Sequence, residues 1–206
     1  MSDASTEPLT ERDLEAWAQV SGMGMAHALT GLSKMLGQAI APGPVSARRV
    51  PLADATALLG GPEAPTAAVY FALSGDAKGH MVLVYQPEVA FELVDMAMGD
   101  PPGTTTELGE MERSVLGEVG NVMGGYFLQT LGDTSGMDLR MSPPAVMMDM
   151  AGAILDAVIA DIMIFSDEVV VVQTEFGNDE RRVRGTFLVM PSPTLIRGLA
   201  ESRRAA

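Results

Sequence analysis

Three polar side chains in the middle of the chain have the spacing of one helix face. Ser114, Glu118 and Asn121 stand at positions i, i+4 and i+7, which lie on the same side of an α-helix. A carboxylate can pair with a cation, and a carboxamide both donates and accepts hydrogen bonds and can orient water. Alone, a glutamate and an asparagine on a helix usually form no more than its solvated face.

The helix that must position these groups is predicted over residues 108–131. Its opposite side carries Val115, Leu116, Val119 and Val122, which form an apolar surface suited to burial against a sheet. The sequence therefore predicts a carboxylate and a carboxamide presented side by side to solvent.

The rest of the chain alternates between helices and short strands. In order, the patterns predict a helix from Thr10 that Pro42 and Pro44 end, a strand over 45–52, a short helix over 54–59, a hairpin of strands 66–74 and 79–85, and a helix from Pro87 to Met98. After the 108–131 helix come a strand over 141–148 interrupted by Pro143 and Pro144, a helix capped by Asp149 and running to Asp161, a hairpin of 168–176 and 182–190, and a helix from Pro193.

The second half thus repeats the order of the first. The long helices align when the first is shifted by 99 positions, which places Val20 on Val119 and Leu29 on Leu128. This predicts an α/β (α+β) protein with a pseudo-twofold repeat of two helix-strand-hairpin units, in one continuous, mostly antiparallel sheet with the long helices packed on it. We expect a disordered tail over 1–9 and a single domain over 10–204, with pseudo-repeats of about 10–100 and 107–204.

Composition excludes several classes of function. The formal net charge of −14 disfavours nucleic acid and anionic membranes as partners. The absence of cysteine excludes disulfides and thiolate sites, and it fits a cytoplasmic protein. We expect no signal peptide, no membrane insertion and no metal site of its own, since His27 and His80 stand apart from other ligand types in the sequence.

The motif and its surroundings resemble the CheC, CheX and FliY family of phosphatases, CheC most of all. The family's signature is Asp or Ser, three residues, Glu, two residues, Asn, then 22 residues and Pro. This chain has Ser114, Glu118, Asn121 and, after 22 residues, Pro144. The resemblance extends over roughly residues 10–200.

The resemblance implies a phosphatase acting on the aspartyl phosphate of a CheY-like response regulator, in chemotaxis or a related two-component pathway. The regulator would supply Mg²⁺ and a lysine. Asn121 would orient a water for in-line attack and Glu118 would pair with the regulator's lysine. Ser114 and Pro144 would have supporting roles.

The first half departs from this signature. At the same shift, Ser114 aligns with Glu15, Glu118 with Gln19 and Asn121 with Gly22, and glycine has no side chain to orient water. We therefore expect one working site and an inactive first one. Two alternatives remain open: a non-catalytic module that docks a response regulator, and a subunit whose main role is to bind a CheD-like protein.

Overall fold

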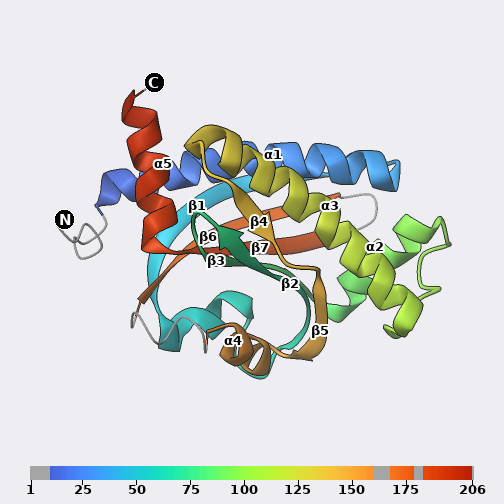
Figure 1. The fold of residues 1–206 in the computed structure, drawn as a ribbon. Helices are drawn as coiled ribbons and strands as arrows, with labels where there is room; N and C mark the ends of the chain where they lie inside the picture. The colour runs from blue at the N-terminus through green and yellow to red at the C-terminus, as the bar shows by residue number, and fades with distance from the viewer. Residues whose placement is uncertain (1–9, 160–167, 179–182, 206) are drawn as a thin grey trace.

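The computed structural model describes residues 10–159, 168–178 and 183–205, which build a seven-stranded sheet in the order β1-β6-β7-β3-β2-β4, with β5 also paired to β2 (Figure 1). All strand pairings are antiparallel. In chain order the elements are α1 (Glu11–Leu36), β1 (Ala41–Pro51), the 3₁₀ helix η1 (Leu52–Leu59), β2 (Pro65–Gly75), β3 (Gly79–Tyr85), α2 (Pro87–Met98), α3 (Glu110–Ser135), β4 (Leu139–Met141), β5 (Ala145–Met150), α4 (Ala151–Ile159), β6 (Glu168–Asn178), β7 (Val183–Pro191) and α5 (Pro193–Ala205).

The sheet has the pseudo-twofold symmetry that the sequence predicts. Its two central strands are β3 and β7, one from each half. The strand segments that follow each long helix pair with a strand of the other half. Thus β1 pairs with β6, where Ala47 lies opposite Val172, and β5 pairs with β2, where Val146 lies opposite Val69. This exchange makes one continuous sheet out of two units, so the predicted fold class is confirmed.

The two long helices begin and end at equivalent positions. Each has 26 residues, and each ends at a glycine in the left-handed conformation, Gly37 after α1 and Gly136 after α3. Thr10 and Asp13 form a reciprocal capping box at the start of α1, the helix predicted from Thr10. The prediction that Pro42 and Pro44 end this helix is wrong: Gly37 ends it, and both prolines lie in the edge strand β1, which is irregular between Pro42 and Val45.

One predicted cap is also wrong. Asp149 lies in β5, where its side chain accepts a hydrogen bond from the Met150 N–H, and α4 begins two residues after it at Ala151. The predicted end of that helix at Asp161 and the predicted start of a strand at Arg182 lie outside the described residues.

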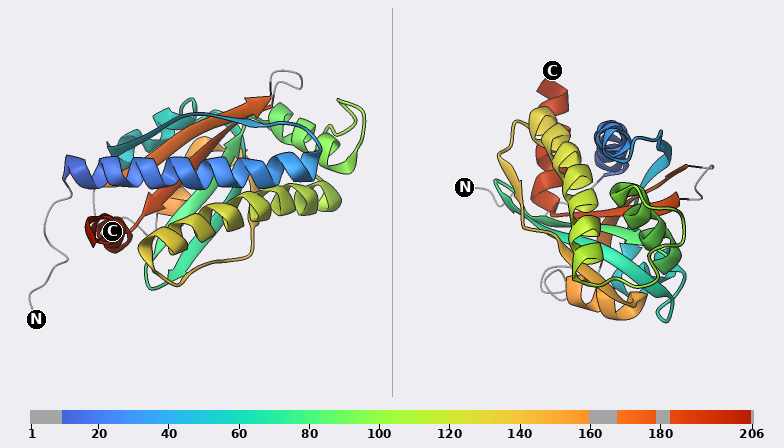
Figure 2. Two further views of the ribbon diagram at one scale, coloured as in Figure 1. Left: turned by 90° about the horizontal axis from the view of Figure 1, so that it is seen from above. Right: turned by 90° about the vertical axis from the view of Figure 1, so that its right-hand side faces the viewer.

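The helices lie on both faces of the sheet. Figure 2 shows α1 and α3 running side by side over one face, and α4 lies with η1 against the other. Phe127 of α3 packs over Gly24 of α1, and Tyr126 packs over Gly31, where a Cβ atom would collide with its ring. The two helices therefore approach closely. This contact holds α3 in place, with its polar face open to solvent.

The close approach of α3 to the sheet gives a first prediction. A Cβ atom on Gly120 would lie 2.6 Å from Val69 Cγ1 and 3.3 Å from Phe71 Cζ, in the packed core. We expect Gly120→Ala to lower the free energy of unfolding by about 1–3 kcal/mol, because the core must move to admit the methyl group. Denaturant unfolding measures this effect.

Gly125→Ala on the same helix is the matched control. Its Cβ would meet nothing nearer than Met141 Cε at 3.8 Å, so the better helix propensity of alanine should stabilise the protein by roughly 0.5–1 kcal/mol. Equal stabilities of the two variants would contradict the packing that we describe.

Candidate functional site

The polar face of α3 carries the motif in an open position. Ser114 and Glu118 are exposed and Asn121 is half-buried. Within the part of the chain that the structure describes, none of the three side chains takes part in a hydrogen bond or an ion pair. Their polar atoms are therefore available to a partner.

Pro144 lies beside this face, although 22 residues separate it from Asn121 in the sequence. It sits in the break between β4 and β5, and its ring lies against α3 at Gly117: a Cβ atom there would be 3.4 Å from Pro144 Cγ. Gly117 directly precedes Glu118, so the structure brings the fourth motif position to the edge of the other three.

The break in the edge strand is held by Ser142. Its N–H donates to Ala72 O at 2.9 Å, and its Oγ accepts from Ala72 N at 3.0 Å. A side-chain oxygen thus replaces the missing strand partner, while Pro143 and Pro144 have no N–H to leave unpaired. The geometry fixes the position of Pro144 against α3.

Arg113 ties the start of α3 to the same edge of the sheet. Its Nε donates to Leu108 O at 3.0 Å, and its Nη1 donates to Val146 O at 3.2 Å. These two bonds set the position of the first turn of α3 on β5, immediately before Ser114. Sequence reasoning missed this residue, because an arginine that closely follows two glutamates, Glu110 and Glu112, in a helix resembles an ordinary solvated charge.

Asp95 organises the loop that leads from α2 to α3. Its side chain is fully buried and accepts hydrogen bonds from the N–H groups of Gly103 at 2.8 Å, Thr104 at 3.1 Å and Thr105 at 2.8 Å. Burial raises the pKa of this carboxyl, but the hydrogen bonds from Thr105, Gly103 and Thr104 outweigh it, so its pKa lies below the ordinary value. No sequence pattern indicates this role except an aspartate and, eight residues later, a Gly-Thr-Thr run.

This arrangement predicts a pH-dependent stability. A carboxyl whose pKa is lower in the folded state stabilises the protein above its unfolded pKa, and this stability is lost as the pH falls through the folded pKa. We expect Asp95→Asn to lower the melting temperature clearly at pH 7 and less at pH 3. Thermal unfolding at both pH values measures the difference, and equal losses at the two would contradict the ionised role of Asp95.

The first half offers a different surface at the equivalent place. Glu15 and Gln19 are exposed on α1, and Gly22 is half-buried. A Cβ atom on Gly22 would lie 3.8 Å from Val45, which stands where the second half has Pro144. The fold thus repeats the place of the motif but neither its asparagine nor its proline.

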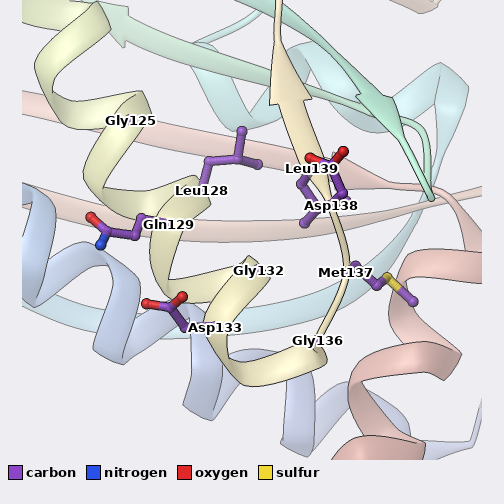
Figure 3. A pocket seen from close by; sticks show the side chains of 9 residues that line it. All are labelled: Gly125, Leu128, Gln129, Gly132, Asp133, Gly136, Met137, Asp138 and Leu139. Atoms are coloured by element: carbon purple, nitrogen blue, oxygen red, sulfur yellow. The ribbon is translucent and has the colours of Figure 1, made fainter.

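Two open grooves lie further along α3 and α1, beyond the motif and its equivalent in the first half. One, of about 590 Å³, lies between the second half of α3 and the segment leading into β4, where Gln129, Asp133 and Asp138 border it (Figure 3). The other, of about 510 Å³, lies at the equivalent place on α1 and is bordered by Lys34 and Gln38. Every residue that lines the first groove has its counterpart, 99 positions earlier, lining the second.

Neither a cluster of metal-ligating side chains nor a membrane-spanning helix occurs among the described residues. No group of three or more His, Cys, Asp and Glu side chains is placed to hold a metal ion there. Among the same residues, no helix is both long enough and apolar enough to cross a membrane.

The chain is similar to known proteins in sequence. The profile of the family described as "Chemotaxis phosphatase CheX" matches residues 67–166. The CheY-P phosphatase CheC of Bacillus subtilis (strain 168) is 25% identical over 187 residues, which cover 89% of this chain and 90% of that protein.

Solved structures share the fold. FliY of Thermotoga maritima superimposes with a TM-score of 0.77 at 22% identity, over 97% of this chain and 99% of that chain. The FliM middle domain of H. pylori superimposes with a TM-score of 0.64 at 13% identity, over 94% of this chain and 99% of that one. The fold is therefore shared with FliY and with the FliM middle domain.

Proposed function

Because the chain resembles the CheC, CheX and FliY family, we propose that it removes the phosphoryl group from the aspartyl phosphate of a CheY-like response regulator. The observation that carries this proposal is the open pair of Glu118 and Asn121 on α3, with Pro144 packed beside them. The proposed setting is the cytoplasm, in chemotaxis or a related two-component pathway.

Asn121 is the proposed catalytic residue. An acyl phosphate is already reactive, so a phosphatase gains most by positioning the attacking water. The carboxamide can accept a hydrogen bond from water and donate one to a phosphoryl oxygen. The water oxygen bonds to phosphorus as the bond from phosphorus to the aspartyl oxygen breaks. The products are inorganic phosphate, which keeps the protons of the water, and a free aspartate.

Glu118 is the proposed docking group. It lies one helical turn from Asn121 on the same exposed face, and it has no partner among the described residues. A carboxylate there can pair with the regulator's lysine and hold Asn121 in line with the phosphoryl group. The regulator's own Mg²⁺ offsets the negative charge of the phosphoryl oxygens in this proposal.

We propose one working site in the chain. The equivalent face of α1 has Gly22 in place of Asn121 and Gln19 in place of Glu118. A glycine cannot hold a water in line, and a glutamine cannot form an ion pair with lysine.

A second candidate is a module that docks the regulator without hydrolysis. Two observations favour it: the incomplete motif on α1 and the likeness of the fold to the FliM middle domain. Such a module would bind a phosphorylated regulator and leave its lifetime unchanged.

Turnover separates the two candidates. A regulator with a labelled phosphoryl group is mixed with this protein in the presence of Mg²⁺. The concentration of this protein is one tenth of that of the regulator. The phosphatase should release all of the label as inorganic phosphate, faster than the regulator does alone. Binding without any added release would instead support the docking module.

A further inference from the structure

Two exposed methionines border the motif. Met111 is 63% exposed and stands seven residues before Glu118, which places it on the same face of α3 two turns away. Met148 in β5 is 40% exposed. Large apolar side chains this open to water mark a surface that is covered in a complex when they gather at one place.

The packing of α3 on the sheet brings the two together. Along the helix, Gly124 meets Met141, and Gly117 meets Pro144 and Val146, so α3 runs opposite in direction to β4 and β5. Met111 lies roughly 9 Å before Gly117 along the helix, and Met148 lies roughly 7 Å beyond Val146 along the strand. Val146 and Met148, two residues apart, point to the same face of the sheet, which is the face that α3 covers. Both methionines are therefore at the N-terminal end of α3, beyond Ser114.

The first half of the molecule shows that packing does not require methionine here. The pseudo-twofold equivalent of Met111 is Arg12, and that of Met148 is Arg49. The strand register confirms the second equivalence, since Met148 lies opposite Ala67 in β2 and Arg49 opposite Val170 at the matching place in β6. The same backbone positions carry exposed arginines in the half that lacks the motif.

We propose that Met111 and Met148 form the apolar margin of the surface that docks the regulator, and that they contact apolar side chains bordering its phosphorylated aspartate. This inference rests on the proposed function. A chain with a net charge of −14 gains little from long-range attraction to an acidic partner, so short-range burial of apolar area must supply much of the affinity. Methionine suits such a contact, because its flexible, polarisable side chain fits irregular surfaces.

The test compares glutamine variants of similar size. We expect Met111→Gln and Met148→Gln each to raise the KM for the phosphorylated regulator, and its Kd in direct titration, about 5- to 10-fold while kcat stays near that of the wild type. Met111→Leu should restore the wild-type values. Met23→Gln is the matched control, because Met23 is 60% exposed but lies on α1, outside the motif-bearing face.

Unchanged KM and Kd in both variants would overturn the inference, as would an equal rise in Met23→Gln. Both variants should fold, because polar side chains occupy the equivalent positions of the first half. Failure of the proposed function would be seen separately, as a wild-type protein that binds the regulator but does not shorten its phosphorylated lifetime. In that case the Kd values alone still decide whether the methionines dock the regulator.

Discussion

Replacing Asn121 with alanine is expected to reduce the dephosphorylation rate at least 100-fold, to that of the regulator alone. The carboxamide supplies the only proposed contact to the attacking water, and loss of one well-placed hydrogen-bonding group commonly costs two to three powers of ten in rate. Binding should persist, because Glu118 and the rest of the α3 face remain. Single-turnover decay of the phosphorylated regulator measures the rate, and titration with the same regulator measures binding.

Gln129→Ala is the matched control for this change. Gln129 is a carboxamide on the same helix, exposed and about two turns beyond Asn121, at the border of the groove. We expect it to leave the rate within about 2-fold of the wild type, since ordinary surface substitutions have small effects. If both variants lost activity equally, the effect would belong to the α3 surface as a whole and the catalytic role of Asn121 would be wrong.

Reversing the charge of Glu118 should act mainly on binding. In Glu118→Lys, a cation faces the regulator's lysine in place of a carboxylate, and two like charges at a docked interface cost several kcal/mol. We expect the Kd for the phosphorylated regulator to rise roughly 100-fold or more. At saturating concentrations of the regulator, turnover should be partly recovered, because Asn121 is intact.

Asp133→Lys makes the same change in net charge at an exposed position of the same helix, outside the motif. It should bind the regulator as well as the wild type, or slightly better if the regulator is acidic. A Kd for Glu118→Lys close to that of Asp133→Lys would show that Glu118 makes no specific contact.

Much of the fold follows from patterns that the chain repeats. The periodic apolar residues of the long helices, the two strand pairs and the prolines that open α2 and α5 each predict an element that the structure contains. The shift of 99 positions predicts the pseudo-twofold relation, because two segments with the same order of elements bury their apolar faces in the same way.

Element boundaries were harder to predict where a nonlocal contact decides them. Gly37 ends α1 because it accepts the left-handed conformation, and Pro42 can then enter an edge strand whose outer side needs no hydrogen-bond donor. Whether β1 is an edge strand depends on its pairing with β6, whose residues lie 117 or more positions later in the chain than their partners. No local pattern contains that information.

The motif residues were predicted from the sequence, but the residues that support them were not. Pro144 reaches α3 only because Ser142 bridges the strand break to Ala72, and α3 keeps its place on β5 through Arg113. Asp95 holds the preceding loop from inside the core. Ser142 and Arg113 bond to backbone groups far along the chain, and Asp95 bonds to a loop eight to ten residues later, so the residue type alone does not reveal the role.

The two halves give the protein an internal comparison. The two long helices have the same length and the two grooves have equivalent linings, yet one half has Glu118 and Asn121 bordered by methionine and the other has Gln19 and Gly22 bordered by arginine. Because the long helices and the grooves are equivalent, these differences concern what each face contacts and not how the chain folds.

The most direct test of the central proposal is the decay rate of a phosphorylated CheY-like regulator with Mg²⁺, measured alone, with the wild type and with Asn121→Ala. We predict that the wild type accelerates the decay and that Asn121→Ala does not, while both proteins bind the regulator equally well. A regulator that binds the wild type but decays no faster than it does alone would contradict the proposal.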